Sequence, residues 1–124
     1  MSDSHSDKFR EVYQIINKIK DEANLDGIIF ANKDGALISE SIGNELNSKK
    51  IASMSATVLE SAVGIGDSIG NQKIKKIVAE LEDKTLFILE CDRSTFFIII
   101  INRESHISYI MSKLEEMIQK VSKM

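Results

Sequence analysis

The sequence is defined first by what it lacks: its 124 residues include no proline, no tryptophan and only one cysteine, Cys91. A single cysteine cannot form an internal disulfide, which fits a chain kept in a reducing compartment. Aromatic residues make up only 6% of the chain, too few for the stacking platforms that bind single-stranded nucleic acid. A net charge of −3 offers no broad basic surface either. These absences predict a cytoplasmic protein that does not bind nucleic acid.

No hydrophobic run is long enough to cross a bilayer. The longest covers residues 96–101, whereas a membrane-spanning helix needs ~20 apolar residues, so we expect no direct membrane insertion. Residues 1–7 are polar and acidic, unlike a secretory signal, and we expect them to form a disordered tail. Residues 8–124 are expected to form a single domain, because 43% hydrophobic and 28% charged residues is ordinary globular composition.

Eight segments of regular structure are predicted from the spacing of the apolar residues. Helical spacing is found in residues 9–23, 46–69 and 107–121. The other segments alternate between apolar and polar residues, or are continuously apolar, and are bounded by turn residues, which is typical of strands. These strands cover residues 25–31, 36–40, 73–82, 85–91 and 94–102. The predicted element order is therefore α-β-β-α-β-β-β-α.

The last predicted strand, residues 94–102, is apolar on both faces. A strand of this kind must be covered from above and below, so we expect helices on both faces of one antiparallel sheet. This architecture is a three-layer α/β/α sandwich. The middle helix is expected on one face, and the first and last helices on the other.

The middle helix carries two apolar stripes, about 110–130° apart around its axis. The first stripe, which we expect to face the sheet, consists of Ile51, Met54, Val58, Ala62, Ile65 and Ile69. The second stripe consists of Ala52, Ala56, Leu59 and Val63. Small side chains favour close contact between helices, and no other helix is free to supply that contact. We therefore predict a symmetric dimer through the second stripe; half-exposed alanines, or three helices on one side of the sheet, are the alternatives.

The predicted strand 73–82 lies at an edge of the sheet if strands pair as consecutive hairpins. A long edge strand without proline is usually protected or paired. Its lysines could protect it, or the same strand of a second copy could pair with it. In the second case the dimer interface also includes Lys75, Lys76, Ile77, Val78, Ala79 and Glu80.

Several short segments, in this order and spacing, resemble the roadblock family, which includes roadblock-type dynein light chains and MglB-type bacterial polarity proteins. They are the Asp34-Gly35 turn with the strand 36–38, the start of the middle helix at residues 51–56, and the strands 76–80 and 86–89. The resemblance covers residues 8 to 122. Since no longer tail follows, the chain looks like a minimal single roadblock domain.

The resemblance implies a five-stranded antiparallel sheet in the order 2-1-5-4-3, as in roadblock-like and profilin-like folds. It also implies homodimers through the third strand and the middle helix. Family members act as scaffolds, often for Ras-like small GTPases, and the resemblance points to the middle helices as the surface that faces the GTPase. On that helix the exposed polar strip available to a partner is Ser53, Thr57, Glu60, Gly64 and Asp67.

Catalytic and cofactor motifs are not found in the sequence. The glycines at Gly64, Gly66 and Gly70 lie within a helical pattern rather than after a strand, so they do not form a phosphate-binding loop. Two distant histidines and Cys91 do not match the spacing of a metal site. Arg93 lies in a predicted turn, where an arginine is usually only solvated rather than a catalytic finger. We expect no enzyme activity, no cofactor and no metal.

The sequence thus predicts a homodimeric, non-catalytic scaffold that binds, and regulates or tethers, a Ras-like small GTPase or another roadblock-type subunit. The alternative is a profilin-like sensor domain for a small molecule. A sensor would need polar groups that converge inside the fold, and the predicted strands offer almost no inward polar residues.

Overall fold

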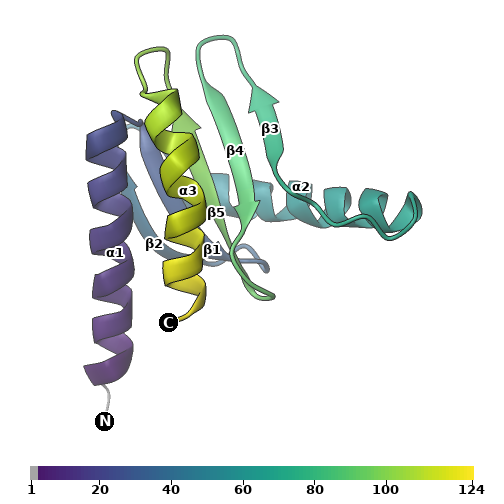
Figure 1. The fold of residues 1–124 in the computed structure, drawn as a ribbon, viewed down its shortest axis with the longest axis horizontal. Helices are drawn as coiled ribbons and strands as arrows, with labels where there is room; N and C mark the ends of the chain where they lie inside the picture. The colour runs from purple at the N-terminus through teal and green to yellow at the C-terminus, as the bar shows by residue number, and fades with distance from the viewer. Residues whose placement is uncertain (1–2) are drawn as a thin grey trace.

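The computed structural model describes residues 3–124 and has the predicted order of elements (Figure 1). The elements are α1 (Asp3–Ala23), β1 (Gly27–Asn32), β2 (Leu37–Ile42), α2 (Ser48–Ser68), β3 (Ile77–Glu80), β4 (Thr85–Glu90), β5 (Thr95–Ile101) and α3 (Ile107–Ser122). Helix α1 begins at Asp3, within the segment expected as a tail, so residues 3–7 are helical. Met1 and Ser2 of that expected tail lie outside the described residues.

The strands form one antiparallel sheet in the order β2-β1-β5-β4-β3. Strand β5 pairs with β1 on one side and with β4 on the other, and all its residues are buried. Its position in the centre confirms the prediction from its apolar sequence. Strands β2 and β3 are the two edges of the sheet.

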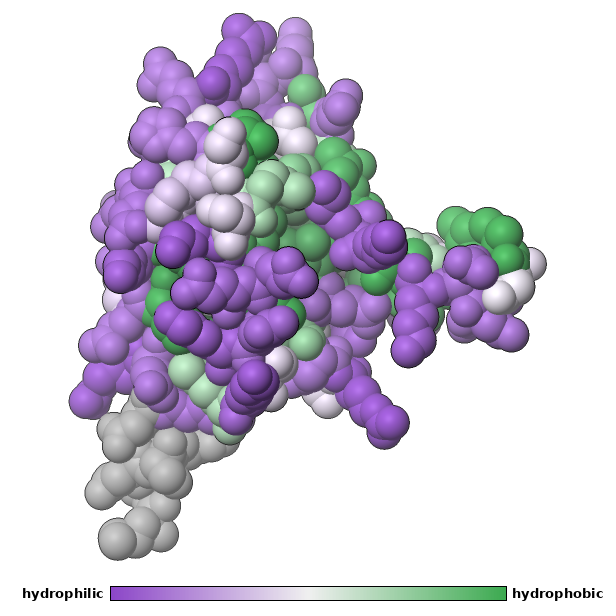
Figure 2. All heavy atoms as spheres, viewed as in Figure 1, coloured by the Kyte–Doolittle hydropathy of each residue, from purple (hydrophilic) through white to green (hydrophobic). Residues whose placement is uncertain are grey.

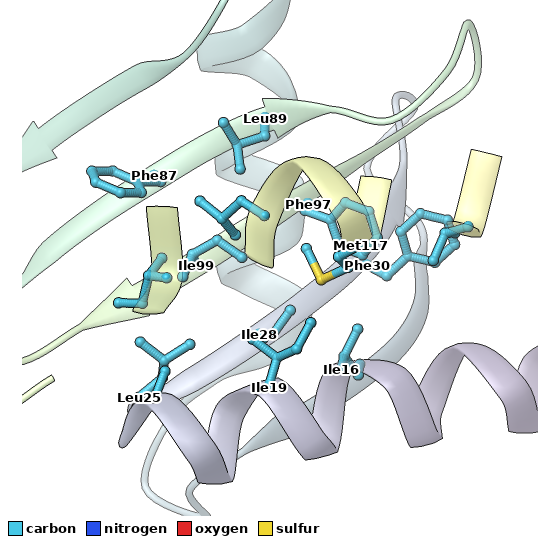
Figure 3. Packing of buried hydrophobic residues seen from close by; sticks show 14 of the residues in the cluster. Ile16, Ile19, Leu25, Ile28, Phe30, Phe87, Leu89, Phe97, Ile99 and Met117 are labelled. Carbon is cyan, nitrogen blue, oxygen red and sulfur yellow. The ribbon is translucent and has the colours of Figure 1, made fainter. Parts of the chain in front are cut away.

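Two hydrophobic cores lie on opposite faces of the sheet, which confirms the three-layer sandwich. The larger core joins α1 and α3 to one face, where Ile16, Phe30, Phe97 and Met117 are packed together (Figure 3). The smaller core joins α2 to the other face. Alternation along β5 supplies both cores, because Phe97 points to the larger core and Phe96 to the smaller one.

Helix α2 is rotated about its own axis relative to the prediction, so that the other apolar stripe faces the sheet. Ala52, Ala56 and Leu59 are buried against the sheet, whereas Met54 and Val58 of the stripe expected to face it are exposed. The physical reason is the limited space between α2 and the sheet. The facing strands present large side chains such as Phe96, and alanines on the helix allow it to approach them closely. Of the residues predicted for a dimer interface, Ala52, Ala56 and Leu59 are instead buried in the core of one chain, and Val63 is partly buried at its margin.

Strand β3 is shorter than predicted and covers Ile77–Glu80 instead of residues 73–82. The residues before it stay beside α2, because the N–H of Gln72 donates a hydrogen bond back to the Gly66 carbonyl at 2.9 Å. Gly66 is needed there, since a Cβ at this position would collide with the Gln72 carbonyl oxygen. The end of α2 and this returning segment project together beyond the β3 edge (Figure 1).

Within residues 3–124, none of the helices combines the length and the hydrophobicity that a membrane crossing requires.

Candidate functional site

An apolar surface on α2 lies open to solvent. Its largest members are Met54, Val58, Ile65 and Ile69, whose side chains are 47–66% exposed. All four belong to the stripe that the sequence assigned to the core. Figure 2 shows hydrophobic atoms gathered on the end of α2 that projects beyond the sheet. We call these four residues the exposed stripe. Exposed apolar residues grouped on one face of a helix are typical of a protein interface.

The β3 edge adjoins this end of α2. Ile77 and Ala79 are half-buried, and Val78 and Glu80 are exposed. Lys75 is exposed in the segment before the strand, and the Lys76 ammonium lies 4.7 Å from the centre of the Phe87 ring. Within residues 3–124, β4 is the one strand that pairs with β3. Its outer backbone groups are therefore available to another strand.

The opposite edge, β2, is more polar. The Ser41 hydroxyl, buried in this strand, donates a 2.6 Å hydrogen bond to the Asn17 side chain of α1. Glu40 is partly buried, and its Oε2 atom lacks a hydrogen-bond partner. A charged residue in an edge strand discourages pairing with another chain. Strand β3 also contains one charged residue, Glu80, but its other three residues are apolar, whereas β2 carries two serines beside Glu40. The β3 edge is therefore the less polar of the two.

The polar strip predicted on α2 is exposed along its whole length. Its residues are Ser53, Thr57, Glu60, Gly64 and Asp67. Counted at about 100° per residue, the centre of this strip lies roughly 130° around the axis of α2 from the centre of the exposed stripe, and Thr57 lies beside Met54. The Thr57 hydroxyl donates to the Ser53 carbonyl at 3.4 Å. Apart from Glu60, the side chains along this strip are short or absent, so a partner can approach the helix closely.

A groove runs beside this strip, between α2 and the turns at one end of the sheet. It consists of two adjoining cavities of about 300 and 450 Å³, both lined by Lys33, Val63 and Glu90. Glu60 lines the smaller cavity; Asp67, Ile74 and Arg93 line the larger. We call this feature the flank groove. Sequence reasoning missed it because four separate segments form it: the β1–β2 turn, α2, residues 72–74 and the β4–β5 turn.

The β4–β5 turn holds Arg93 at the rim of the flank groove. The Asp92 carboxylate accepts hydrogen bonds from the Ser94 N–H at 2.8 Å, the Thr95 N–H at 2.9 Å and the Thr95 hydroxyl at 2.8 Å. Burial alone would raise the pKa of Asp92, but these hydrogen bonds and the charge of Lys33 outweigh it and lower the pKa below its usual value. The turn is thus rigid, and Arg93 at its tip is exposed.

Cys91 is partly buried, and its Sγ atom lies 3.9 Å from the Ile118 carbonyl oxygen. Burial raises the pKa of this thiol, which makes it a weaker nucleophile at neutral pH. Among the described residues, no three His, Cys, Asp or Glu side chains form a group that could hold a metal ion.

Comparisons with known proteins agree with this fold. Solved structures similar to the chain include MglB of Myxococcus xanthus, with a TM-score of 0.86, 16% sequence identity, and coverage of 93% of this chain and 87% of the other. They also include an MglB with a tetrameric arrangement, with a TM-score of 0.84 and 8% identity over 94% of this chain and 88% of the other. A Roadblock/LC7 domain from Streptomyces avermitilis has a TM-score of 0.80 and 14% identity over 88% and 92%.

A search of curated proteins found no match. The family model described as Roadblock/LC7 domain, however, matches residues 11–101. The match spans β1 to β5 and most of α1, and so includes α2 and the β3 edge. The chain therefore belongs to the Roadblock/LC7 domain family.

Proposed function

We propose that the protein is a homodimeric, non-catalytic adaptor of the cytoplasm that binds a Ras-like small GTPase. The observation that carries the proposal is the exposed stripe on α2 next to the bare β3 edge. A single chain leaves both features uncovered, and a second copy placed about a twofold axis covers both at once. The arrangement corrects the predicted dimer: β3 stays in the interface, while the exposed stripe replaces the buried alanine stripe of α2.

The charges of α2 support an antiparallel pairing of the two helices. Lys49 and Lys50 occupy the first turn, which contains no acidic residue, and the last turn contains no basic residue. Cations at the positive end of a helix are unfavourable in an isolated helix. In an antiparallel pair they lie near the negative end of the partner helix, which favours their positive charge. The same charges would repel one another in a parallel pair.

Self-association can be tested by light scattering at tens of micromolar protein. A stable interface buries at least ~1,000 Å², so we expect a dimer mass for the natural sequence. Ile65→Glu places a carboxylate in the exposed stripe and should yield a monomer. Glu60→Lys, roughly 140° around the helix axis from Ile65, is the control and should remain dimeric. A monomer mass for the natural sequence would contradict the proposed dimer.

For the GTPase, the proposed contact is the polar strip on the paired α2 helices. Small side chains lose little conformational entropy when a partner covers them. A pull-down from native lysate with mass spectrometry identifies the GTPase. Thr57→Arg combined with Glu60→Arg should then abolish its binding without changing the mass of the dimer. Unchanged affinity would place the GTPase elsewhere, on the face of α1 and α3.

The alternative of a small-molecule sensor gains no support from the interior. Both cores consist of apolar side chains, and a buried ligand site needs polar groups that fix the orientation of the ligand.

A further inference from the structure

The segment that contains β3 has its charged residues in two blocks. Lysines come first and acidic residues follow, with the uncharged residues 77–79 between them. The six charged residues are Lys73, Lys75, Lys76, Glu80, Glu82 and Asp83. When two copies of such a segment run antiparallel, the basic block of each lies opposite the acidic block of the other, whereas a parallel pair would bring like charges together. The charge pattern of this edge is therefore complementary to a second copy of itself.

Lys76 and Glu80 lie on the same face of the sheet, at the two ends of this edge. Val78 stands between them and is opposite Phe87 of β4, which belongs to the larger core under α1 and α3. Alternate residues of a strand point to the same face, so Lys76 and Glu80 share the face of Val78. The position of the Lys76 ammonium over the Phe87 ring agrees with this. Within residues 8–124, neither Lys76 nor Glu80 forms an ion pair, and both are exposed.

A twofold axis limits how two copies of β3 can pair. Residues directly opposite each other in an antiparallel pair share a face of the sheet. Because the proposed dimer has both α2 helices on one face, one residue of β3 must lie on the axis, opposite its own copy. With Val78 on the axis, Lys76 of each copy lies opposite Glu80 of the other, and Ile77 lies opposite Ala79. Two pairs of opposite charge then flank the axis, and the exposed Val78 is covered by its counterpart.

The neighbouring registers do not match the charges within the strand. With Ile77 on the axis, Lys76 would lie opposite the apolar Val78. With Ala79 on the axis, Lys76 would lie opposite Glu82, which is beyond the end of β3, in the turn to β4. The register centred on Val78 is therefore the one that pairs a lysine with a glutamate of the strand.

We propose that Lys76 and Glu80 select a second copy of this chain as the partner of the β3 edge, through two cross-strand ion pairs about a twofold axis at Val78. This inference rests on the proposed homodimer and adds the basis on which a copy of the chain is distinguished from another roadblock-type subunit. Charges on an edge strand oppose pairing with a strand that lacks matching charges, so a subunit with another charge pattern is rejected. The exposed stripe supplies affinity, and the charges supply selectivity.

Two single variants test the pairing, measured by sedimentation equilibrium of the full chain. Lys76→Glu places a carboxylate opposite Glu80 of the other copy, and Glu80→Lys places an ammonium opposite Lys76. Each variant turns two attractive pairs into two repulsive ones, so the Kd of its homodimer should rise by at least about tenfold. Lys123→Glu is the control, because it makes the same change of charge as Lys76→Glu at an exposed residue that follows α3. Its Kd should equal that of the natural sequence.

Combining the two substitutions should restore pairing. In an equimolar mixture of Lys76→Glu and Glu80→Lys, both cross-strand contacts again join opposite charges, so a heterodimer should form. Native mass spectrometry identifies it when one variant is labelled with a heavy nitrogen isotope. The double variant, with both substitutions in one chain, should form a homodimer again but should not pair with the natural sequence. Such a rescue also shows that the single variants are folded, because an unfolded chain cannot regain its partner through a charge on another chain.

Single variants that dimerise as tightly as the natural sequence would overturn the inference. So would a mixture or a double variant that stays monomeric, or a double variant that pairs freely with the natural sequence. If the natural sequence is itself dimeric under those outcomes, the proposed homodimer stands and only the selection by charge is rejected. A natural sequence that is monomeric by light scattering would reject the proposed homodimer, and this inference with it.

Discussion

Val58 and Leu59 are neighbours in sequence but lie in opposite environments, because Leu59 is 2% exposed and Val58 is 47% exposed. Leu59 packs against the sheet with Ala56 and Phe96. Val58 faces solvent as part of the exposed stripe. Substitutions at these two positions therefore test two different properties: Leu59 the stability of the single chain, and Val58 its self-association.

Leu59→Glu should unfold the chain. A carboxylate buried without a partner costs about 3 kcal/mol or more, a large part of the stability of a small domain. Val58→Glu should keep the fold and lose the dimer. Urea unfolding followed by circular dichroism measures the first effect, and light scattering the second. If the folded, monomeric variant is Leu59→Glu instead, the orientation of α2 in the structure is wrong.

Two glycines of the same helix should respond in opposite directions to alanine. Gly66→Ala forces a Cβ against the Gln72 carbonyl oxygen, and the resulting backbone shift should cost about 1–3 kcal/mol of unfolding free energy. Gly64→Ala meets no atom within 4 Å and should stabilise the chain by about 0.5–1 kcal/mol through its better helix propensity. Thermal unfolding of both variants measures the difference. Equal effects would show that the returning segment is not packed on α2.

The Asp26 carboxylate joins the start of β1 to the β3–β4 turn. Burial alone would raise its pKa, but the ion pair with Lys84 and a 2.8 Å hydrogen bond from Asn102 outweigh it and lower the pKa below the ordinary value of 3.8. A lowered pKa means that the contribution of Asp26 to stability is present above about pH 4 and is lost as the pH falls through the folded-state value.

Asp26→Asn should therefore lower the unfolding free energy at pH 7 by about 1 kcal/mol, because Lys84 is partly exposed and the pair is screened by solvent. The difference from the natural sequence should shrink as the pH falls below 4. Asp83→Asn is the control, since its ion pair with Arg103 is exposed and should contribute little. Urea unfolding midpoints of both variants and of the natural sequence, measured from pH 3 to 7, test this prediction. A constant difference across that range would contradict the ionic role of Asp26.

Cys91 should react slowly in the folded protein. Its partly buried thiol has a raised pKa, so at pH 8 less of it is thiolate than in an unfolded chain. With 5,5′-dithiobis(2-nitrobenzoate) the native rate should be at least about tenfold lower than the rate in urea. Equal rates would show that the end of β4 is open.

The sequence predicted the sheet better than it predicted the use of α2. The pattern of residues 96–101 determines the central position of β5, because only a strand with both faces covered can be apolar throughout. For α2, hydrophobicity favoured the larger stripe with Met54 and Ile65 as the buried one. Packing decided otherwise, because Ala52 and Ala56 fit against Phe96 and its neighbours.

The polar strip on α2 was predicted as exposed and is exposed, because any helix with two apolar stripes leaves its polar residues to solvent. The flank groove could not be predicted. Its lining residues, from Lys33 to Arg93, come together only through tertiary contacts. The spacing of apolar residues in the sequence indicates local structure and does not indicate such contacts. To predict the groove, one would need to know how its four segments pack against one another.

The central position of β5 also determines when the chain can fold during its synthesis. The β1–β2 and β3–β4 pairs are local and can form as soon as each leaves the ribosome. Only β5 joins these two pairs into one sheet, because it lies between β1 and β4. Until residues 95–101 emerge, a nascent chain holds two separate hairpins whose inner edges are uncovered. Those edges are the places where a partly made chain can be captured by a chaperone or by another nascent copy.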